Sequence, residues 1–177
     1  QAGTFFVSPA GSDSNPGTFD RPWKTISHGA RTMAGGDTLN VRGGTYTNSV
    51  TRDWKAGTPA APTVVQAYNG ETVVCKPYGN SEFFYFGNSS AHDIVISGFK
   101  VDAVNLALSP PAIKITEGAH SITITNCEIY NVPSAHGILI AEGNLTTYSN
   151  KVQNCVIHDI SIRYDGGSDD HGVYLSG

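Results

Sequence analysis

Three basic side chains occupy positions where they could exchange a proton with a ligand. His136 and His171 each precede a glycine at the start of an apolar stretch, and Lys114 lies inside a similar stretch. Imidazole titrates near neutral pH, and lysine acts as a base where its surroundings lower its pKa. We therefore treat these three residues as candidate catalytic groups. The alternative is a packed turn residue for each histidine and a solubilising surface charge for Lys114.

A second group of residues has side chains that could bind a ligand. Tyr85 and Tyr174 offer aromatic ring faces, and Arg163 offers a guanidinium that pairs with carboxylates. Segment 165–170 contains three carboxylates, and oxygen ligands of this kind suit calcium. Calcium is therefore a candidate cofactor, although such a segment is also typical of a solvated loop. The candidate metal ligands are Asp165, Asp169 and Asp170.

The elements that must position these residues form a repeat. Three similar apolar blocks begin at Ile96, Ile124 and Val152, each 28 residues after the one before. A second block follows each of them, at 112–116, 137–141 and 172–176. Short strands that recur at a fixed period of 20–50 residues indicate a solenoid. The sequence therefore predicts an all-β parallel β-helix of about five rungs.

The repeat also predicts which way each side chain points. Equivalent residues of successive rungs should stack, with apolar residues inward and the alternating residues outward. Gly98, Asn126 and Asn154 share one corner, where glycine and asparagine tolerate the left-handed backbone conformation. Stacked asparagines can also hydrogen-bond along the axis. The outward column of the second block should contain Tyr85, Lys114, Leu139 and Tyr174.

Residues 1–36 lie outside the repeat. They contain a short apolar run at 4–7 and a turn-rich segment at 8–20. Trp23, Ile26, Ala30 and Met33 then fall on one face of a helix that would start near Pro22. Because the first rung of a solenoid needs a cover, we expect this helix to cap it. The rungs should occupy 37–177 within one domain spanning 1–177, with loops at 47–61 and 76–82.

Composition narrows the class of protein. The net charge of −4 argues against a dedicated nucleic-acid binder, and no apolar run reaches the length of a membrane span. The chain starts at Gln1, as a processed secreted protein would, although an expression-tag remnant could also begin this way. Two Asn-x-Ser/Thr acceptors fit an extracellular location, and the candidate glycosylation sites are Asn88 and Asn144.

The three cysteines cannot all pair with one another. Cys127 and Cys155 hold equivalent positions in successive repeats, so they should stack at the strand spacing, within Cα reach of a disulfide. Two stacked, reduced thiols are the alternative. Cys75 belongs to another column and should be a free thiol in the core.

Three motifs resemble the opening segment of right-handed parallel β-helix proteins of the pectate-lyase superfamily. They are FVSPAGSDSNPGT at 6–18, PWKTI at 22–26 and GDTLNVRGGTY at 36–46. The resemblance implies three parallel sheets, an asparagine ladder, and an active groove along the first sheet and the loops leading into it. Many members cleave acidic polysaccharides by β-elimination, often with calcium, whereas others hydrolyse glycosides.

The resemblance turns the candidate residues into a functional hypothesis. Lys114, His136 or His171 would remove the proton α to a uronate carboxylate, and Tyr85, Tyr174 and Arg163 would bind the polysaccharide or glycan. We favour a secreted polysaccharide-lyase-like enzyme over a glycoside hydrolase that uses Asp169 and Asp170. The alternative is a non-catalytic, lectin-like or host-interacting carbohydrate-binding protein.

The length of the chain departs from the family pattern. Family enzymes usually have eight or more rungs, and this sequence stops directly after a strand. We expect a fragment, an unusually short solenoid, or a homodimer formed through the open C-terminal rung, because an unpaired strand edge invites association. Nucleic acids and membranes are not expected as partners.

Overall fold

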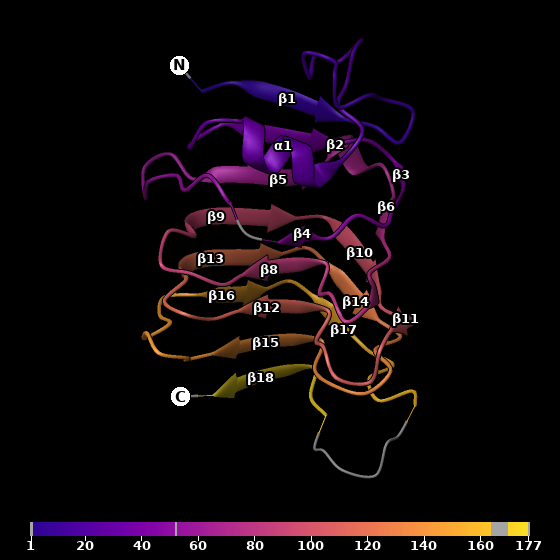
Figure 1. Cartoon of the computed structure of the whole chain (residues 1–177), viewed down its shortest axis with the longest axis vertical. Coiled ribbons are helices and arrows are strands. Elements are labelled where there is room, and N and C mark those ends of the chain that lie inside the picture. The colour runs from indigo at the N-terminus through magenta and orange to yellow at the C-terminus, as the bar shows by residue number, and fades with distance from the viewer. Residues whose placement is uncertain (1, 52, 164–169, 177) are drawn as a thin grey trace.

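The protein is a parallel β-solenoid, seen in a computed structural model that describes residues 2–51, 53–163 and 170–176 (Figure 1). Successive turns of chain pass through three sheets, which we call sheets A, B and C. Sheet A has the strand order β1-β2-β5-β9-β13-β16. Its strands are β1 (Thr4–Val7), β2 (Thr38–Val41), β5 (Thr63–Ala67), β9 (His92–Ser97), β13 (His120–Thr125) and β16 (Lys151–Gln153).

Sheets B and C complete each turn, and every paired strand in the three sheets is parallel to its neighbour. Sheet B contains β3 (Gly44–Tyr46), β6 (Val73–Cys75), β10 (Phe99–Asp102), β14 (Glu128–Tyr130) and β17 (Val156–Ile157). Sheet C contains β4 (Val50–Thr51), β8 (Phe84–Phe86), β12 (Ile113–Ile115), β15 (Ile138–Ala141) and β18 (Val173–Ser176). This arrangement confirms the predicted three-sheet solenoid.

The register of the strands confirms the predicted columns. Ile96 pairs with Ile124 and Ile124 with Val152 in sheet A. In sheet C the inward column of the second block includes Ile113 and Ile138, both fully buried. Side chains of this kind contribute about 1.5–3 kcal/mol each when they leave water, so stacked apolar columns stabilise every rung against the next.

The corner between sheets A and B has the predicted backbone. Gly98, Asn126 and Asn154 have φ values of 83°, 54° and 53°, all in the left-handed region. Asn126 also links neighbouring rungs, because its Nδ2 donates to the Oγ of Ser97 at 3.4 Å. The corner therefore depends on residues that tolerate positive φ and can hydrogen-bond along the solenoid axis.

The predicted helix is shorter than its pattern suggested. Helix α1 spans Ile26–Thr32, and Thr25 caps it by accepting a hydrogen bond from the N–H of His28. Trp23 instead forms a bridge to Val7 of β1, so the chain before Thr25 belongs to the strand layer. The helix packs against β1, β2 and β4, at the amino-terminal end of the solenoid as predicted (Figure 1).

The two long connections are more ordered than expected. The predicted loop at 47–61 contains β4, and the predicted loop at 76–82 contains β7 (Tyr78–Gly79). Strand β7 pairs with β11 (Asn105–Leu106), forming a two-stranded sheet beside the main stack. A short 3-10 turn, Tyr68–Gly70, follows β5. These short elements lie too close to turn residues for periodicity to reveal them.

The last rung is the most exposed part of the apolar column. Val152 and Ile157 are only half-buried, and Leu175 is 70% exposed. These residues have the inward register of their column, but no further rung covers them among the residues described. The homodimer predicted through this rung stays a prediction.

Candidate functional site

The outward face of sheet C holds the predicted column. Tyr85 pairs in register with Lys114, Lys114 with Leu139, and Leu139 with Tyr174. The Nζ of Lys114 lies 5.7 Å from the centroid of the Tyr85 ring, a cation–π distance. The side chains of Tyr85 and Lys114 are half-buried. Strand alternation was therefore sufficient to bring these residues onto one face.

The strand starts of sheet C form a second column. The strand pairing of sheet C aligns one residue of each strand with its equivalents in the neighbouring rungs. The residues two positions before these aligned residues are Asn48, Glu82, Pro111, His136 and His171. The rings of His136 and His171 stack with centroids 5.5 Å apart, which confirms that they lie one rung apart. The ring of Tyr174 stacks on both of them, at 4.5 Å and 5.2 Å. We call His136, His171 and Tyr174 the aromatic platform.

Neighbouring groups determine the tautomer of His136 and lower its pKa. The backbone N–H of His171 donates to Nδ1 of His136 at 3.2 Å, so a neutral His136 carries its proton on Nε2. Burial, reinforced by the charge on His171, lowers the pKa of His136 below its usual 6.5, although Asp170 opposes the shift. With Nδ1 occupied, His136 is placed to donate a hydrogen bond from Nε2 to a ligand.

Arg163 makes contacts that the sequence did not predict. Its Nη2 donates to the carbonyl oxygens of Val104 and Leu106, at 3.2 Å and 2.6 Å. Its backbone N–H donates to the carbonyl of Pro133. These contacts join the loops that lead from sheet B to sheet C in different rungs. The Nη2 group thus holds loops of different rungs together, and ligand binding by Arg163 stays a prediction.

The solenoid with these columns matches a known protein family. A model described as Pel9A-like, right handed beta helix region matches residues 5–173. The chain belongs to this family. It is a pectate-lyase-like, right-handed β-helix protein, as the opening motifs indicated.

Relatives of this Pel9A-like chain include polysaccharide-active proteins. Over 74 residues it is 43% identical to pectate lyase PEL9 of Emericella nidulans, a match that covers 41% of this chain and 18% of that protein. A solved structure of rhamnogalacturonan lyase superposes with a TM-score of 0.65 at 17% identity, over 99% of this chain and 51% of that one.

A GH136 lacto-N-biosidase from Eubacterium ramulus is similarly related in structure. Its TM-score is 0.65 at 14% identity, over 98% of this chain and 40% of that one. At such identities the likeness concerns the fold alone. This Pel9A-like chain spans about half the length of the rhamnogalacturonan lyase, and its match covers under a fifth of PEL9.

The predicted calcium ligands are only partly placed in this Pel9A-like chain. Asp165 and Asp169 lie outside the described residues. The Oδ1 of Asp170 is buried and accepts no hydrogen bond from the described residues, which suits a cation ligand. Calcium takes six to eight oxygen ligands, and among the described residues no group of three or more acidic, histidine or cysteine side chains gathers, around Asp170 or elsewhere. Calcium binding stays a prediction centred on Asp170.

The predicted modification sites are accessible. Asn88 and Asn144 are exposed, as an attached glycan requires, and glycosylation itself stays a prediction.

None of the helices among the described residues has the length and apolar character needed to cross a membrane.

The cysteines adopt the reduced alternative. Cys75, Cys127 and Cys155 are all free thiols in this structure, so the Cys127–Cys155 disulfide is not formed. The Sγ atoms of Cys127 and Cys155 instead donate to backbone carbonyls, of Thr125 at 3.2 Å and Gln153 at 3.3 Å. The pair is stacked in adjacent rungs at the corner, as the repeat predicts.

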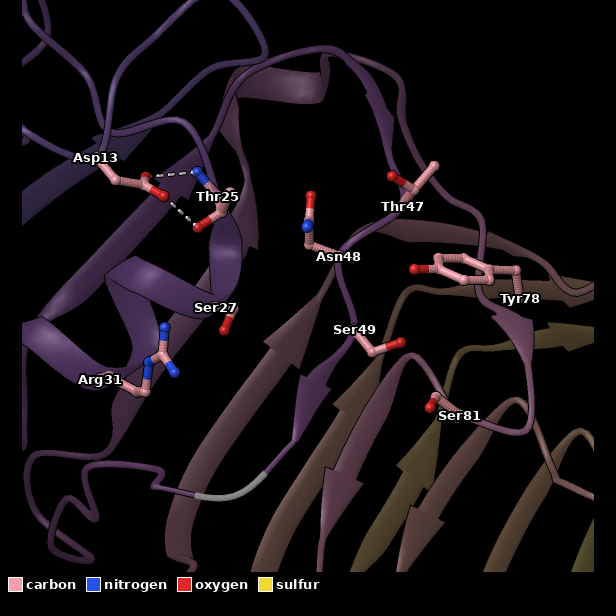
Figure 2. Close-up of a pocket in the computed structure, with 9 residues that line it drawn as sticks. All are labelled: Asp13, Thr25, Ser27, Arg31, Thr47, Asn48, Ser49, Tyr78 and Ser81. Atoms are coloured by element: carbon pink, nitrogen blue, oxygen red, sulfur yellow. Dashed lines mark hydrogen bonds between the residues drawn. The ribbon is translucent and has the colours of Figure 1, made fainter.

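The sequence did not predict a polar pocket of about 400 Å³ that lies at the amino-terminal end of the β-solenoid (Figure 2). It lies between α1 and the loops that precede β4 and β8. The repeat could have indicated one of its residues, because Asn48 belongs to the same strand-start column as His136. The residues that line it are Asp13, Thr25, Ser27, Arg31, Thr47, Asn48, Ser49, Tyr78 and Ser81.

Proposed function

We propose that this chain forms part of a secreted carbohydrate-active protein that binds acidic polysaccharide along sheet C and cleaves it by β-elimination. The observation that carries the proposal is the outward column, in which Lys114 lies over the ring of Tyr85, on the same face as Tyr174 of the aromatic platform. A lysine beside aromatic rings suits a sugar that bears a carboxylate. Membership of a pectate-lyase-like family supports the same substrate class.

Lys114 is the residue that we assign to the reacting sugar. As a neutral amine it would remove the proton α to the uronate carboxylate, and the C–O bond at the β carbon would break as the double bond forms. The ammonium produced would then offset the charge of the enolate-like anion. The departing oxygen would take its proton from water. One residue thus supplies both the base and the charge.

The aromatic platform would bind a neighbouring sugar. Tyr174 lies two strands from Lys114, roughly 10 Å at the usual spacing of parallel strands, and the histidines precede it along the chain. The Nε2–H of His136 would donate to a hydroxyl or carboxylate oxygen, while the exposed Tyr174 ring would pack on a sugar face.

The test is an assay for unsaturated uronides. Wild-type chain is incubated with polygalacturonate, rhamnogalacturonan or alginate, with calcium and with a chelator, and ultraviolet absorbance is followed. Lys114→Ala should lose product formation by at least about 100-fold, the usual range for a general base. Lys151→Ala, which removes an exposed lysine of sheet A, is the matched control and should keep full activity. Release of reducing ends without absorbance would indicate hydrolysis instead.

A non-catalytic glycan-binding role is the second candidate. The specific observation in its favour is the stacked platform, because His136, His171 and Tyr174 form a preorganised flat surface on which a sugar ring could pack. Glycan-array binding that is lost in Tyr174→Ala, with no product from any substrate, would support this role. Turnover that depends on Lys114 would exclude it.

A further inference from the structure

The amino-terminal pocket has one wall built by helix α1. Ser27 and Arg31 are four residues apart, so they share one face of the helix, and both line the pocket on the helix side (Figure 2). Ile26 and Ala30, on the other face, are buried in the core. The amphipathic pattern that anchors α1 therefore also holds the Arg31 side chain at the pocket, on a rigid support.

The charge of Arg31 is available to a ligand. In the part of the chain that is described, no carboxylate forms an ion pair with it. The nearby carboxylate of Asp13 is already satisfied, because it accepts hydrogen bonds from the N–H groups of Lys24 and Thr25 and from the Thr25 hydroxyl, at 2.8–2.9 Å. These bonds keep the pKa of Asp13 low against the effect of burial. Asp13 thus fixes the wall, and Arg31 supplies the positive charge.

The opposite wall offers a ring face and neutral polar groups. Tyr78 is 65% exposed, yet its backbone is held in β7 by pairing with β11. Asn48, Ser49 and Ser81 add an amide and two hydroxyls around the same space (Figure 2). An exposed aromatic ring on a fixed backbone, surrounded by neutral donors and acceptors, suits the alternating C–H and hydroxyl surface of a sugar.

The pocket also lies in line with the site on sheet C. Asn48 holds the strand-start position of the first rung that His136 and His171 hold in later rungs. Four strand spacings separate Asn48 from His171, roughly 19 Å along the solenoid axis. A polymer that follows the strand starts of sheet C would therefore reach this pocket.

We propose that the pocket is a binding subsite for a carboxylate-bearing sugar unit. Arg31 pairs with the carboxylate, which a planar guanidinium can hold through two hydrogen bonds. Tyr78 packs against one face of the sugar ring, and Asn48 hydrogen-bonds a hydroxyl. The inference rests on the proposed function for the identity of the polymer, but the pocket binds its sugar unit independently of any cleavage on sheet C.

The test is a calorimetric titration with galacturonate trimer at low ionic strength. Arg31→Ala should weaken binding by about tenfold, equivalent to about 1.4 kcal/mol, and Arg31→Lys by less. Tyr78→Ala should weaken binding to a similar degree. Arg21→Ala is the matched control, because Arg21 is exposed and lies outside the pocket lining, and it should bind as wild type does. Circular dichroism melts establish that each variant is folded.

A neutral galactose trimer supplies the second arm. It should bind weakly, and Arg31→Ala should leave that weak binding unchanged. The proposal is overturned if galacturonate trimer does not bind wild-type chain, if Arg31→Ala binds it normally, or if the neutral trimer binds equally well. The turnover of Lys114→Ala separates the two proposals. If Lys114→Ala loses turnover but Arg31→Ala binds galacturonate trimer normally, only the pocket proposal is refuted. Weakened Arg31→Ala binding without any turnover refutes the lyase alone.

Discussion

The backbone N–H of His171 donates to Nδ1 of His136, the equivalent residue one rung earlier. This bond exists only while His136 is neutral, because protonation converts Nδ1 from an acceptor into a donor. Two rungs of sheet C are therefore joined by a hydrogen bond that depends on pH. The stacked rings of the same two histidines, 5.5 Å apart, reinforce the effect, since two charged imidazoles would repel.

We expect His136 to make the chain less stable in mild acid. The folded-state pKa of His136 lies below the unfolded value near 6.5. At pH values between these two, the unfolded state therefore binds more protons than the folded state. Stability from this residue is thus complete above about pH 6.5 and is lost as the pH falls through the folded-state pKa.

The measurement compares urea unfolding of wild type and His136→Asn, which keeps an acceptor but does not titrate. The free energy of unfolding of wild type should fall relative to the variant between about pH 8 and pH 5. Nitrogen-15 NMR at high pH should find the proton of His136 on Nε2. A parallel fall in both proteins would contradict the assignment.

His158 should have the opposite pH dependence. Hydrogen bonds with the carboxylates of Asp159, at 2.8 Å, and Glu128, at 3.2 Å, raise the pKa of His158 above its usual value. Its contribution is therefore fully present below the unfolded pKa near 6.5 and is lost as the pH rises through the folded-state pKa.

Thermal melts of wild type and His158→Gln should reveal this difference. The advantage of wild type in Tm should be larger at about pH 5.5 than at about pH 8.5, and about 1 M salt should reduce it because the groups are exposed. An advantage that does not vary with pH would mean that the Tyr130–His158 ring stack, at 5.5 Å, matters more than the charges.

A β-branched residue in place of a corner asparagine should destabilise the fold. Asn126 has a φ of 54°, a conformation that costs most L residues roughly 1–2 kcal/mol. Asn126→Val should lower the free energy of unfolding by about that amount, whereas Asn126→Gly, which matches Gly98 of the preceding rung, should change it by less than about 0.5 kcal/mol. Urea titration measures both. Equal losses would point instead to the hydrogen bond with Ser97.

The paired thiols should differ in reactivity. The neighbouring Cys127 thiol lowers the pKa of Cys155, while the proximity of Cys155 and burial raise the pKa of Cys127. Burial also raises the pKa of Cys75 well above its usual value. The half-exposed Cys155 therefore has the greatest thiolate character of the three cysteines, and we expect it to be the reactive residue.

Brief alkylation with iodoacetamide at pH 7, followed by peptide mass spectrometry, checks this order. Cys155 should react roughly threefold faster in wild type than in Cys127→Ala, because the larger thiolate fraction outweighs the lower nucleophilicity. Cys75 should react only after unfolding. Faster labelling of Cys155 in the variant would contradict the assignment.

Much of the fold was predictable from particular residues. The spacing of Ile96, Ile124 and Val152 predicted the solenoid, and the positive φ of Asn126 followed from its place at the corner. The short strands β4 and β7 were not predictable, because two residues carry no period. The contacts of Arg163 were not predictable either, because its Nη2 donates to carbonyls of Val104 and Leu106, far away in sequence.

The sequence by itself determined the repeat, and the repeat determined which residues share a column. For this reason, residue spacing alone was enough to assign Lys114 and Tyr174 to sheet C and the two histidines to the loops that lead into it. Only the tertiary structure decided what those columns contact. The tautomer of His136, the stacking of Tyr174 over both imidazoles and the pocket between Arg31 and Tyr78 depend on distances between loops of different rungs. Residue spacing sets the order of such loops along the solenoid axis, but side-chain packing sets how closely they approach.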